Sequence, residues 1–198
     1  MIATLDMERR FPRFAHLVEA LNGPLHERAL KVFMVIVLAH WAEHIVQAYQ
    51  IFVLGMARPD SRGVLGQIFP VLVKSEALHY AYAIVMLVGL ALLLPGFSGR
   101  ARTWWAIALA VQFWHHIEHF VLQGQAIMGQ NLFGSPVPIS IVQVWVPRVE
   151  LHLFYNTVVF LPMLVAMYYH LYPSAGELAA HPPACTCARR PSPTHSAA

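Results

Sequence analysis

The chain has 198 residues, of which 58% are apolar or aromatic and only 12% are charged. One core of this size cannot hide so many apolar side chains, so much of the surface is expected to face lipid. The formal net charge of +3 argues against nucleic acid as a partner. Both cysteines lie in a Pro-rich terminal stretch, which argues against a disulfide-stapled secreted fold.

Residues 1–31 are expected to form a cytoplasmic, interfacial segment. Residues 6–20 carry Phe11, Phe14 and Leu17 at helical spacing beside three arginines, a pattern typical of an amphipathic helix in the membrane interface. The first long apolar run begins too far into the chain for a signal peptide, and no small-residue cleavage site follows it.

Four apolar runs follow that are long enough to cross a bilayer, which takes about 20 helical residues. They cover residues 32–54, 71–94, 104–123 and 149–171. Turn signals occupy 58–63 and 95–102, and a loop is expected over 124–138, with 139–146 lying along the interface or dipping into it. The predicted fold class is an all-α integral membrane protein, a bundle of four transmembrane helices over residues 32–172.

The positions of lysine and arginine predict the orientation. Nine of them fall in the N-terminal arm, the second loop and the tail, and four fall on the other side. The positive-inside rule therefore predicts a multi-pass protein of the cell membrane with both termini in the cytoplasm. From Pro173 onward the sequence is rich in Pro, Ala, Ser and Thr, so residues 173–198 are expected to form a disordered cytoplasmic tail.

Each predicted span contains one glutamate, and each glutamate has histidine beside it. An ionised side chain near the bilayer centre costs about 2.5–3.5 kcal/mol, so these groups need a compensating partner. All four clusters fall at a similar depth, between the bilayer middle and the outer leaflet, which indicates one shared site. The predicted metal ligands are His40, Glu43, His44, Glu76, His79, His115, His116, Glu118, His119, Glu150 and His152.

Two patterns occur twice along the chain. The string His40-x-x-Glu43-His44 recurs as His115-x-x-Glu118-His119, and Glu76-Ala-Leu-His79 recurs as Glu150-Leu-His152 with one residue dropped. Because an even number of helices per repeat preserves orientation, we expect two parallel two-helix repeats, over about 32–95 and 104–172.

Helix geometry predicts which of these side chains share a face. Residues at i, i+3 and i+4 converge, which holds for each His-x-x-Glu-His string. His116 lies about 100° from His115 around the helix. Glu150 and His152 lie about 200° apart, so either the helix is distorted near Pro147 or one of the two faces a neighbouring helix.

Four further residues are expected to support the ligands. Gln47 and Gln123 follow the two His-x-x-Glu-His strings and are expected to orient ligands by hydrogen bonding. Tyr82 and Tyr155 occupy matching places one turn after His79 and His152. We expect them to be hydrogen-bond donors rather than redox-active radicals.

Glutamates from four helices together with a Glu-x-x-His motif match the arrangement of metal ligands in carboxylate-bridged di-metal bundles. Nitrogen and oxygen donors suit iron, copper, zinc or manganese better than calcium or magnesium. We therefore expect two metal ions per chain, with iron favoured, bridged by glutamates and terminated by histidines. In collecting histidines at helical spacing the site resembles that of membrane desaturases and hydroxylases, an analogy of site and not of family.

The function that best fits this site is oxygen-dependent oxidation of a hydrophobic molecule, an oxygenase-, hydroxylase- or desaturase-like reaction. Expected partners are the lipid bilayer, a hydrophobic or lipid-like substrate, an electron-donor protein and a second copy of the chain.

Three alternatives stay open. His-x-x-Glu-His is also the pattern of inverted zincin hydrolases, in which a glutamate serves as general base. A metal transporter or sensor would use a site near the outer leaflet as an entrance. A protein with two b haems would use His44, His79, His119 and His152 as axial ligands.

The remaining histidines and the two cysteines lie outside these clusters. Cys185 and Cys187, with His181 and His195, are either incidental thiols or a soft-metal ligand set in the tail. His16, His26 and His170 are expected to be interfacial.

Overall fold

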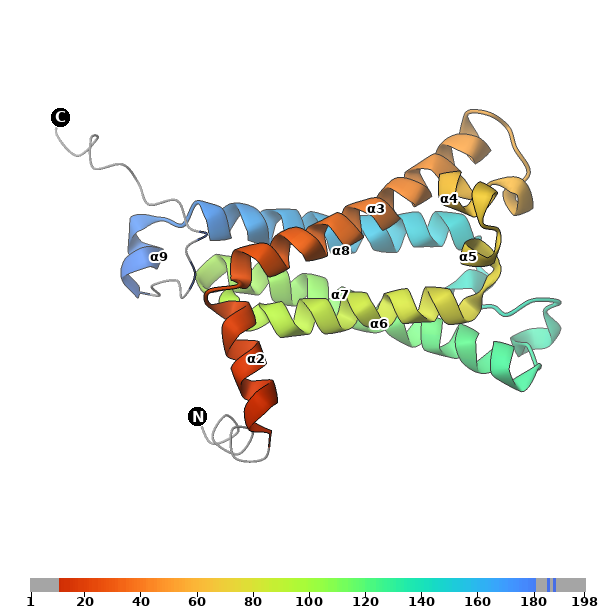
Figure 1. Ribbon diagram of the computed structural model, residues 1–198. Helices are drawn as coiled ribbons and strands as arrows, with labels where there is room; N and C mark the ends of the chain where they lie inside the picture. The colour runs from red at the N-terminus through yellow and green to blue at the C-terminus, as the bar shows by residue number, and fades with distance from the viewer. Residues whose placement is uncertain (1–10, 181–184, 186, 188–198) are drawn as a thin grey trace.

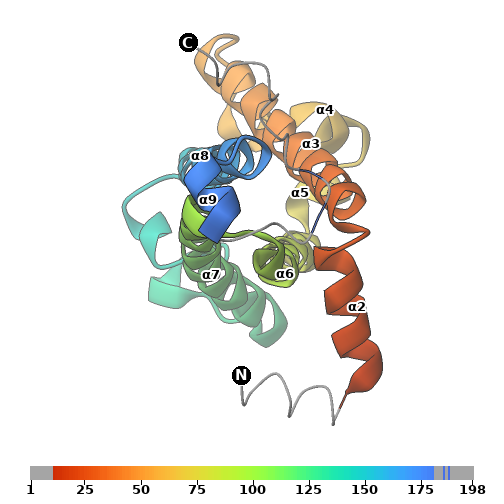
Figure 2. The ribbon, with the colours of Figure 1, turned by 90° about the vertical axis from the view of Figure 1, so that its left-hand side faces the viewer.

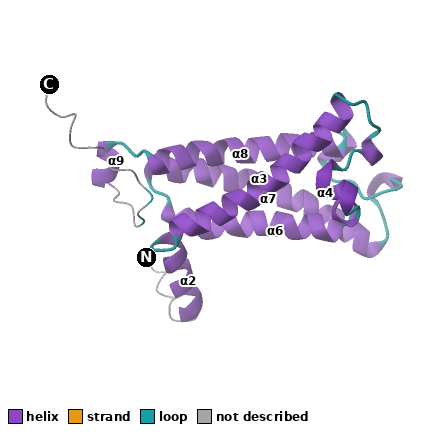
Figure 3. Cartoon of the chain, turned by 45° about the horizontal axis from the view of Figure 1, so that its top comes forward, coloured by secondary structure: helices purple, strands orange, loops and turns teal. Residues whose placement is uncertain are grey.

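The computed structural model describes residues 11–180 together with 185 and 187, and its regular structure over these residues is entirely helical (Figure 3). Four long helices run side by side: α3 (His26–Phe52), α6 (Glu76–Leu93), α7 (Gly99–Met128) and α8 (Arg148–Leu171) (Figure 1). α3 and α7 each contact both α6 and α8. α3 and α7 therefore stand diagonally across the bundle, and the all-α prediction is confirmed.

Within the part of the chain that the structure describes, three segments are long and apolar enough to cross a bilayer: His26–Phe52, Glu76–Gly96 and Arg148–Leu171. Large apolar side chains point outward from them, with Val32 and Val35 exposed to 62% and 66%. α7 has the length, 30 residues, but arginines, glutamines and histidines interrupt its apolar sequence. Exposed apolar faces of this extent are characteristic of a protein that packs against lipid.

The helix boundaries differ from the predicted spans mainly in the second and third. The predicted run 71–94 is broken into a short α5 (Val71–Lys74) and α6, because Ser75 adopts an extended conformation and its hydroxyl caps α6 by accepting from the Leu78 N–H. α7 continues past Gln123 to Met128 and ends where Gly129 takes a left-handed conformation.

Short elements close the two ends of the bundle (Figure 1). At one end, η1 (Arg58–Asp60), α4 (Gly63–Ile68) and α5 join α3 to α6, and η3 (Leu132–Gly134) and η4 (Val142–Val144) join α7 to α8. At the other end lie η2 (Leu94–Gly96), α2 (Pro12–Asn22) and α9 (Ala175–Ala180), as the view along the bundle shows (Figure 2). α3 diverges from α6 towards the end that carries α4 and α5 (Figure 1).

The apolar core fills the half of the bundle nearer α2 and α9. Trp105 is fully buried, and its indole N–H donates to the Leu90 carbonyl oxygen at 2.8 Å. The Phe97 ring stacks on it with centroids 4.2 Å apart. A buried indole with its hydrogen bond satisfied anchors α7 against α6.

α2 leaves the bundle at a steep angle (Figure 1) and exposes Phe11, Phe14 and Leu17. This exposed apolar side is what an interfacial helix requires, although residues 6–10 of the predicted amphipathic helix lie outside the described residues. Asn22 fixes the end of α2, because its amide donates to the Val18 and Leu92 carbonyls and accepts from the Gly96 N–H.

α9 forms inside the segment where we expected a disordered tail. Glu177 accepts from the Ser174 N–H and hydroxyl at the start of this helix and pairs with Arg100 at the start of α7. The Arg100 guanidinium holds the pKa of the Glu177 carboxyl well below its usual range. Composition misses this helix because its anchor is an ion pair to a residue 77 positions away.

Asn22→Ala should destabilise the fold, because it leaves the buried Gly96 N–H and the Leu92 carbonyl without partners, at about 1–3 kcal/mol for each unsatisfied group. The measurement is thermal unfolding of the detergent-purified protein. Glu19→Ala is the matched control, since the Glu19 side chain on the same helix is 83% exposed. Equal melting temperatures for the two variants would contradict a structural role for Asn22.

Candidate metal centre

Six histidines from all four long helices meet inside the bundle. The His152 ring lies 5.2–5.4 Å, centroid to centroid, from those of His44, His115 and His119, and 6.2 Å from that of His79. The rings of His40 and His44 lie 4.6 Å apart, as do those of His115 and His119. This six-histidine cluster consists of His40, His44, His79, His115, His119 and His152.

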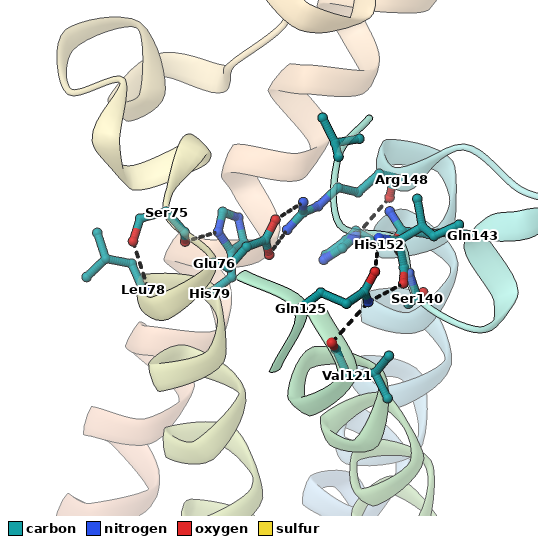
Figure 4. A network of polar contacts seen from close by, with 12 residues as sticks. Ser75, Glu76, Leu78, His79, Val121, Gln125, Ser140, Gln143, Arg148 and His152 are labelled. Atoms are coloured by element: carbon teal, nitrogen blue, oxygen red, sulfur yellow. Dashed lines mark hydrogen bonds and ion pairs between the residues drawn. The ribbon is translucent and has the colours of Figure 1, made fainter. Parts of the chain in front are cut away.

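Two of these rings are held in one tautomer by the backbone of their own helices (Figure 4). His79 Nδ1–H donates to the Ser75 carbonyl at 2.9 Å, and His152 Nδ1–H donates to the Arg148 carbonyl at 2.8 Å. A carbonyl oxygen only accepts, so the proton is on Nδ1 and Nε2 carries a lone pair. The His152 Nε2 atom is buried and has no hydrogen-bond partner.

His44 is held in the same tautomer by a side chain. Its Nδ1–H donates to Gln47 Oε1 at 2.7 Å, and both residues are buried. The His44 Nε2 atom then faces His40 Nε2 at 3.1 Å. Three histidines from α3, α6 and α8 therefore present neutral Nε2 lone pairs, the form that binds metal ions.

The nitrogen separations are those that a shared ion requires. His40 and His44 have Nε2 atoms 3.1 Å apart, and those of His115 and His119 are 3.2 Å apart. Two nitrogens bound to one ion at about 2.1 Å lie roughly 3.0–3.4 Å apart in octahedral or tetrahedral geometry. The nitrogens of His115, His119 and His152 all lie within 4.8 Å of one another, so this trio could hold an ion.

A tyrosine stacks on one histidine in each half of the cluster. Tyr82 lies parallel to His40 with ring centroids 3.7 Å apart, and Tyr155 lies parallel to His115 at 4.4 Å. The Tyr155 hydroxyl accepts from the Trp114 indole N–H at 2.8 Å. The tyrosines therefore contact the cluster through their ring faces, which fix the planes of the two histidines.

Glu43 and Glu118 lie one turn from the histidines and bind the loops that follow their helices. Glu43 Oε1 accepts from the Leu65 N–H of α4, and Glu118 Oε1 accepts from the Val142 N–H of η4, both at 2.9 Å. We expected these carboxylates to bridge metals. One oxygen of each instead accepts a hydrogen bond from a backbone amide. Glu43 Oε2 is buried without a partner.

Glu76 and Glu150 are paired with arginines. Arg148 donates to both oxygens of Glu76 and thereby joins α8 to α6 beside the cluster (Figure 4). Glu150 pairs with Arg58 of η1. α8 runs unbroken from Arg148, so Glu150 and His152 face different neighbours, which is the second of the two outcomes that their 200° separation allowed.

His116 was predicted to be a metal ligand and Gln123 to orient ligands, and both lie outside the ring contacts of the six-histidine cluster. His116 stacks on Tyr80 at 5.3 Å, as expected for a side chain 100° from His115, and its Nδ1 has no partner. Gln123 Oε1 is also buried without a partner.

Gln50 and Gln125 hold the loops beside the cluster, a role that the sequence did not predict. Gln50 accepts from the Gly63 N–H after α3, and Gln125 binds Leu132 and Ile139 after α7. Their equal spacing from the two histidine strings was the available signal.

A cavity of about 440 Å³ reaches the cluster from the gap between α3, α6 and α4. His40, His44 and His79 line its inner wall, and most of the remaining lining is apolar, including Ile36, Leu65, Leu72 and Leu78. Ile36, Leu65, Leu72 and Leu78 are also exposed on the molecular surface. A hydrophobic molecule of moderate size can approach the Nε2 atoms by this route.

Comparison with known proteins adds no independent assignment. The sequence matches no protein family, and no curated protein or solved structure is significantly similar to it. Only the geometry of the chain itself therefore indicates a function.

Gly63→Ala should weaken the loop contact beside the cluster. Gly63 has a φ of +72°, and a Cβ there would lie 2.0 Å from Glu43 Oε2. The left-handed conformation alone costs a non-glycine residue about 1–2 kcal/mol. We expect lower thermal stability and faster amide exchange at Leu65.

Gly124→Ala is the matched control, because an added Cβ at that position of α7 has open space around it. Since alanine favours the helix by about 1 kcal/mol over glycine, this variant should be no less stable than the wild type. Equal destabilisation by both substitutions would contradict the assigned role of Gly63.

Proposed function

We propose that the protein is a membrane-embedded metal-dependent oxidoreductase, in which the six-histidine cluster binds metal ions and oxidises a hydrophobic substrate with dioxygen. The observation that carries the proposal is the fixed tautomer of His44, His79 and His152. Each has its Nδ1–H bound to an oxygen acceptor, so each presents an Nε2 lone pair to the cluster. Such outer hydrogen bonds are the usual means of orienting metal-binding histidines.

Six nitrogen donors favour two ions, or one six-coordinate ion, over a single tetrahedral zinc. An imidazole-rich ligand set suits iron and copper, the metals that react with dioxygen, and iron remains our first choice. The rings contact one another directly, with centroids 5.2–5.4 Å apart around His152, which favours small ions over a haem macrocycle.

The direction of access supports an apolar substrate. The cavity beside His40 and His79 is walled largely by aliphatic side chains and lies against a surface rich in exposed apolar residues. A substrate dissolved in the bilayer could therefore reach the cluster without crossing water. Bound metal would supply dioxygen activation, and the protein would supply orientation and the exclusion of water.

We further propose that α7 crosses the membrane with the other three helices, giving two parallel two-helix repeats with both termini in the cytoplasm. Paired contacts support the repeat. The pairs His40–His44, Tyr82–His40 and Glu43–Leu65 in the first half match His115–His119, Tyr155–His115 and Glu118–Val142 in the second. An electron-donor protein would act from the cytoplasmic side.

Hydrolysis is the second candidate, and one observation favours it. Glu43 Oε2 is buried, has no hydrogen-bond partner and belongs to a residue that lines the cavity beside His40 and His44. A carboxylate in that position could serve as general base to a metal-bound water. Zinc in place of a redox-active metal would support this function over oxidation.

His152→Ala should remove most of the bound metal, because His152 contacts four other rings of the cluster. Elemental analysis of the detergent-purified protein measures the loss. His16→Ala is the matched control, since the His16 side chain is 80% exposed on α2. Full retention of metal by His152→Ala would refute the cluster as the binding site.

Glu43→Gln separates the two roles open to that glutamate. If Glu43 only holds the Leu65 amide, the glutamine carbonyl can still accept that bond and the metal content should stay near the wild-type value. If Glu43 bridges two ions, the substitution removes the bridging charge and should cost most of the metal.

Dioxygen consumption tests the reaction class. The wild-type protein, reduced chemically under anaerobic conditions and then exposed to oxygen, should consume dioxygen and return to its oxidised visible spectrum. His152→Ala should consume little. A colourless, zinc-containing protein that consumes no dioxygen would eliminate the oxidoreductase proposal, and a Soret band would indicate haem instead.

A further inference from the structure

A second group of metal-binding side chains lies at the opposite end of the bundle from the six-histidine cluster. His26 is the first residue of α3, His170 is in the last turn of α8, and Cys185 follows α9. Their candidate ligand atoms lie within 4.8 Å of one another, and all three residues are buried.

The sequence suggested a different arrangement for these residues. His26 and His170 were expected to be interfacial, and they are instead 0% and 5% exposed. The thiols were considered together with His181 and His195, which lie outside the described residues. The contact of the α3 and α8 histidines with Cys185 joins residues far apart in the sequence, and no local pattern encodes it.

His26 is oriented as a ligand. Its Nδ1–H donates to the Leu21 carbonyl at 2.9 Å, which leaves the lone pair on Nε2. That Nε2 atom is buried and has no hydrogen-bond partner. Gly96 gives the ring its space, because a Cβ there would lie 2.3–2.7 Å from three atoms of the imidazole. A fully buried imidazole with an unpartnered lone pair needs an electrophile or a donor.

His170 and Cys185 lie beside His26 and, with Cys187, supply the other candidate ligands. The His170 ring packs against His26 with centroids 5.1 Å apart, and its Nε2 lies 3.3 Å from Cys185 Sγ. Cys187, two residues further along the chain, is buried as well. Both cysteines are free. Two imidazoles and the Cys185 thiol thus converge from three separate parts of the chain, with the second free thiol, Cys187, two residues after the first.

We propose that His26, His170, Cys185 and Cys187 bind one zinc ion. Two nitrogen and two sulfur ligands make the closed tetrahedral set that structural zinc prefers, and each thiol loses its proton on binding. The ion would join the start of α3, the end of α8 and the segment after α9. This site does not depend on the six-histidine cluster, whose ligands are all nitrogen.

The test is cobalt(II) substitution in the full-length, detergent-purified protein after removal of metals with a chelator. Cobalt bound by thiolate gives a sulfur-to-metal charge-transfer band, which a histidine-only site does not give. The wild type should show this band at one equivalent of sulfur-ligated cobalt, and zinc should displace it. X-ray absorption of the zinc form should show sulfur at about 2.3 Å and nitrogen at about 2.0–2.1 Å.

Four variants show which residues give rise to the charge-transfer band. Cys185→Ser, nearly isosteric and outside the bundle helices, should weaken the band, because one of the two thiolates is lost, while leaving the helical circular dichroism unchanged, and His26→Gln should weaken cobalt binding. His16→Ala should have no effect. His152→Ala should keep the band, because it removes a ligand of the other site, so failure of the two proposals is distinguishable.

Three outcomes would overturn the zinc proposal. The first is a wild-type protein without the charge-transfer band, and the second is a band whose intensity is unchanged in Cys185→Ser. The third is a disulfide between Cys185 and Cys187 in protein purified without added reductant.

Discussion

The structure depends on how neutral imidazoles are kept in a dry helical bundle. Each buried ring has two nitrogens with opposite needs, one donor and one acceptor. His79 and His152 satisfy the donor with the carbonyl four residues earlier in their own helices, and His44 satisfies it with Gln47. With the donor side fixed, the lone pairs can only turn towards one another. A concentration of lone pairs at one point is unfavourable unless an ion occupies it.

The acidic residues extend this constraint outward. Carboxylates beside the cluster could neutralise bound cations, yet they also anchor the chain around it. Glu43 and Glu118 hold the loops after α3 and α7, whereas Glu76 and Glu150 are paired with arginines. Buried charge is costly unless it is paired, so these contacts lower the cost of placing the glutamates in the bundle and also define the walls of the site.

The sequence predicted the long helices and the six clustered histidines, because histidine and glutamate are rare within an otherwise apolar sequence. Helical periodicity located the long helices, and the i, i+4 spacing of His40 and His44 correctly put the two rings side by side. What it could not predict were contacts between distant segments. Glu150 meets Arg58 across 92 positions, and Cys185 meets His170 although α9 lies between them in the sequence. Such partners depend on loop paths, which carry little periodic signal.

The two ends of the bundle then differ in chemistry for a physical reason. The six-histidine cluster is beside an apolar cavity that leaves access to its ligands, as reactive sites require. His26 is fully buried and packs against Phe97, His170 and Gly96, and the Cys185 thiol in the same group follows α9. A zinc ion bound there as proposed would have no open position and would only hold segments of the chain together. On these two proposals, histidines would serve reaction where the bundle opens and attachment where it is closed.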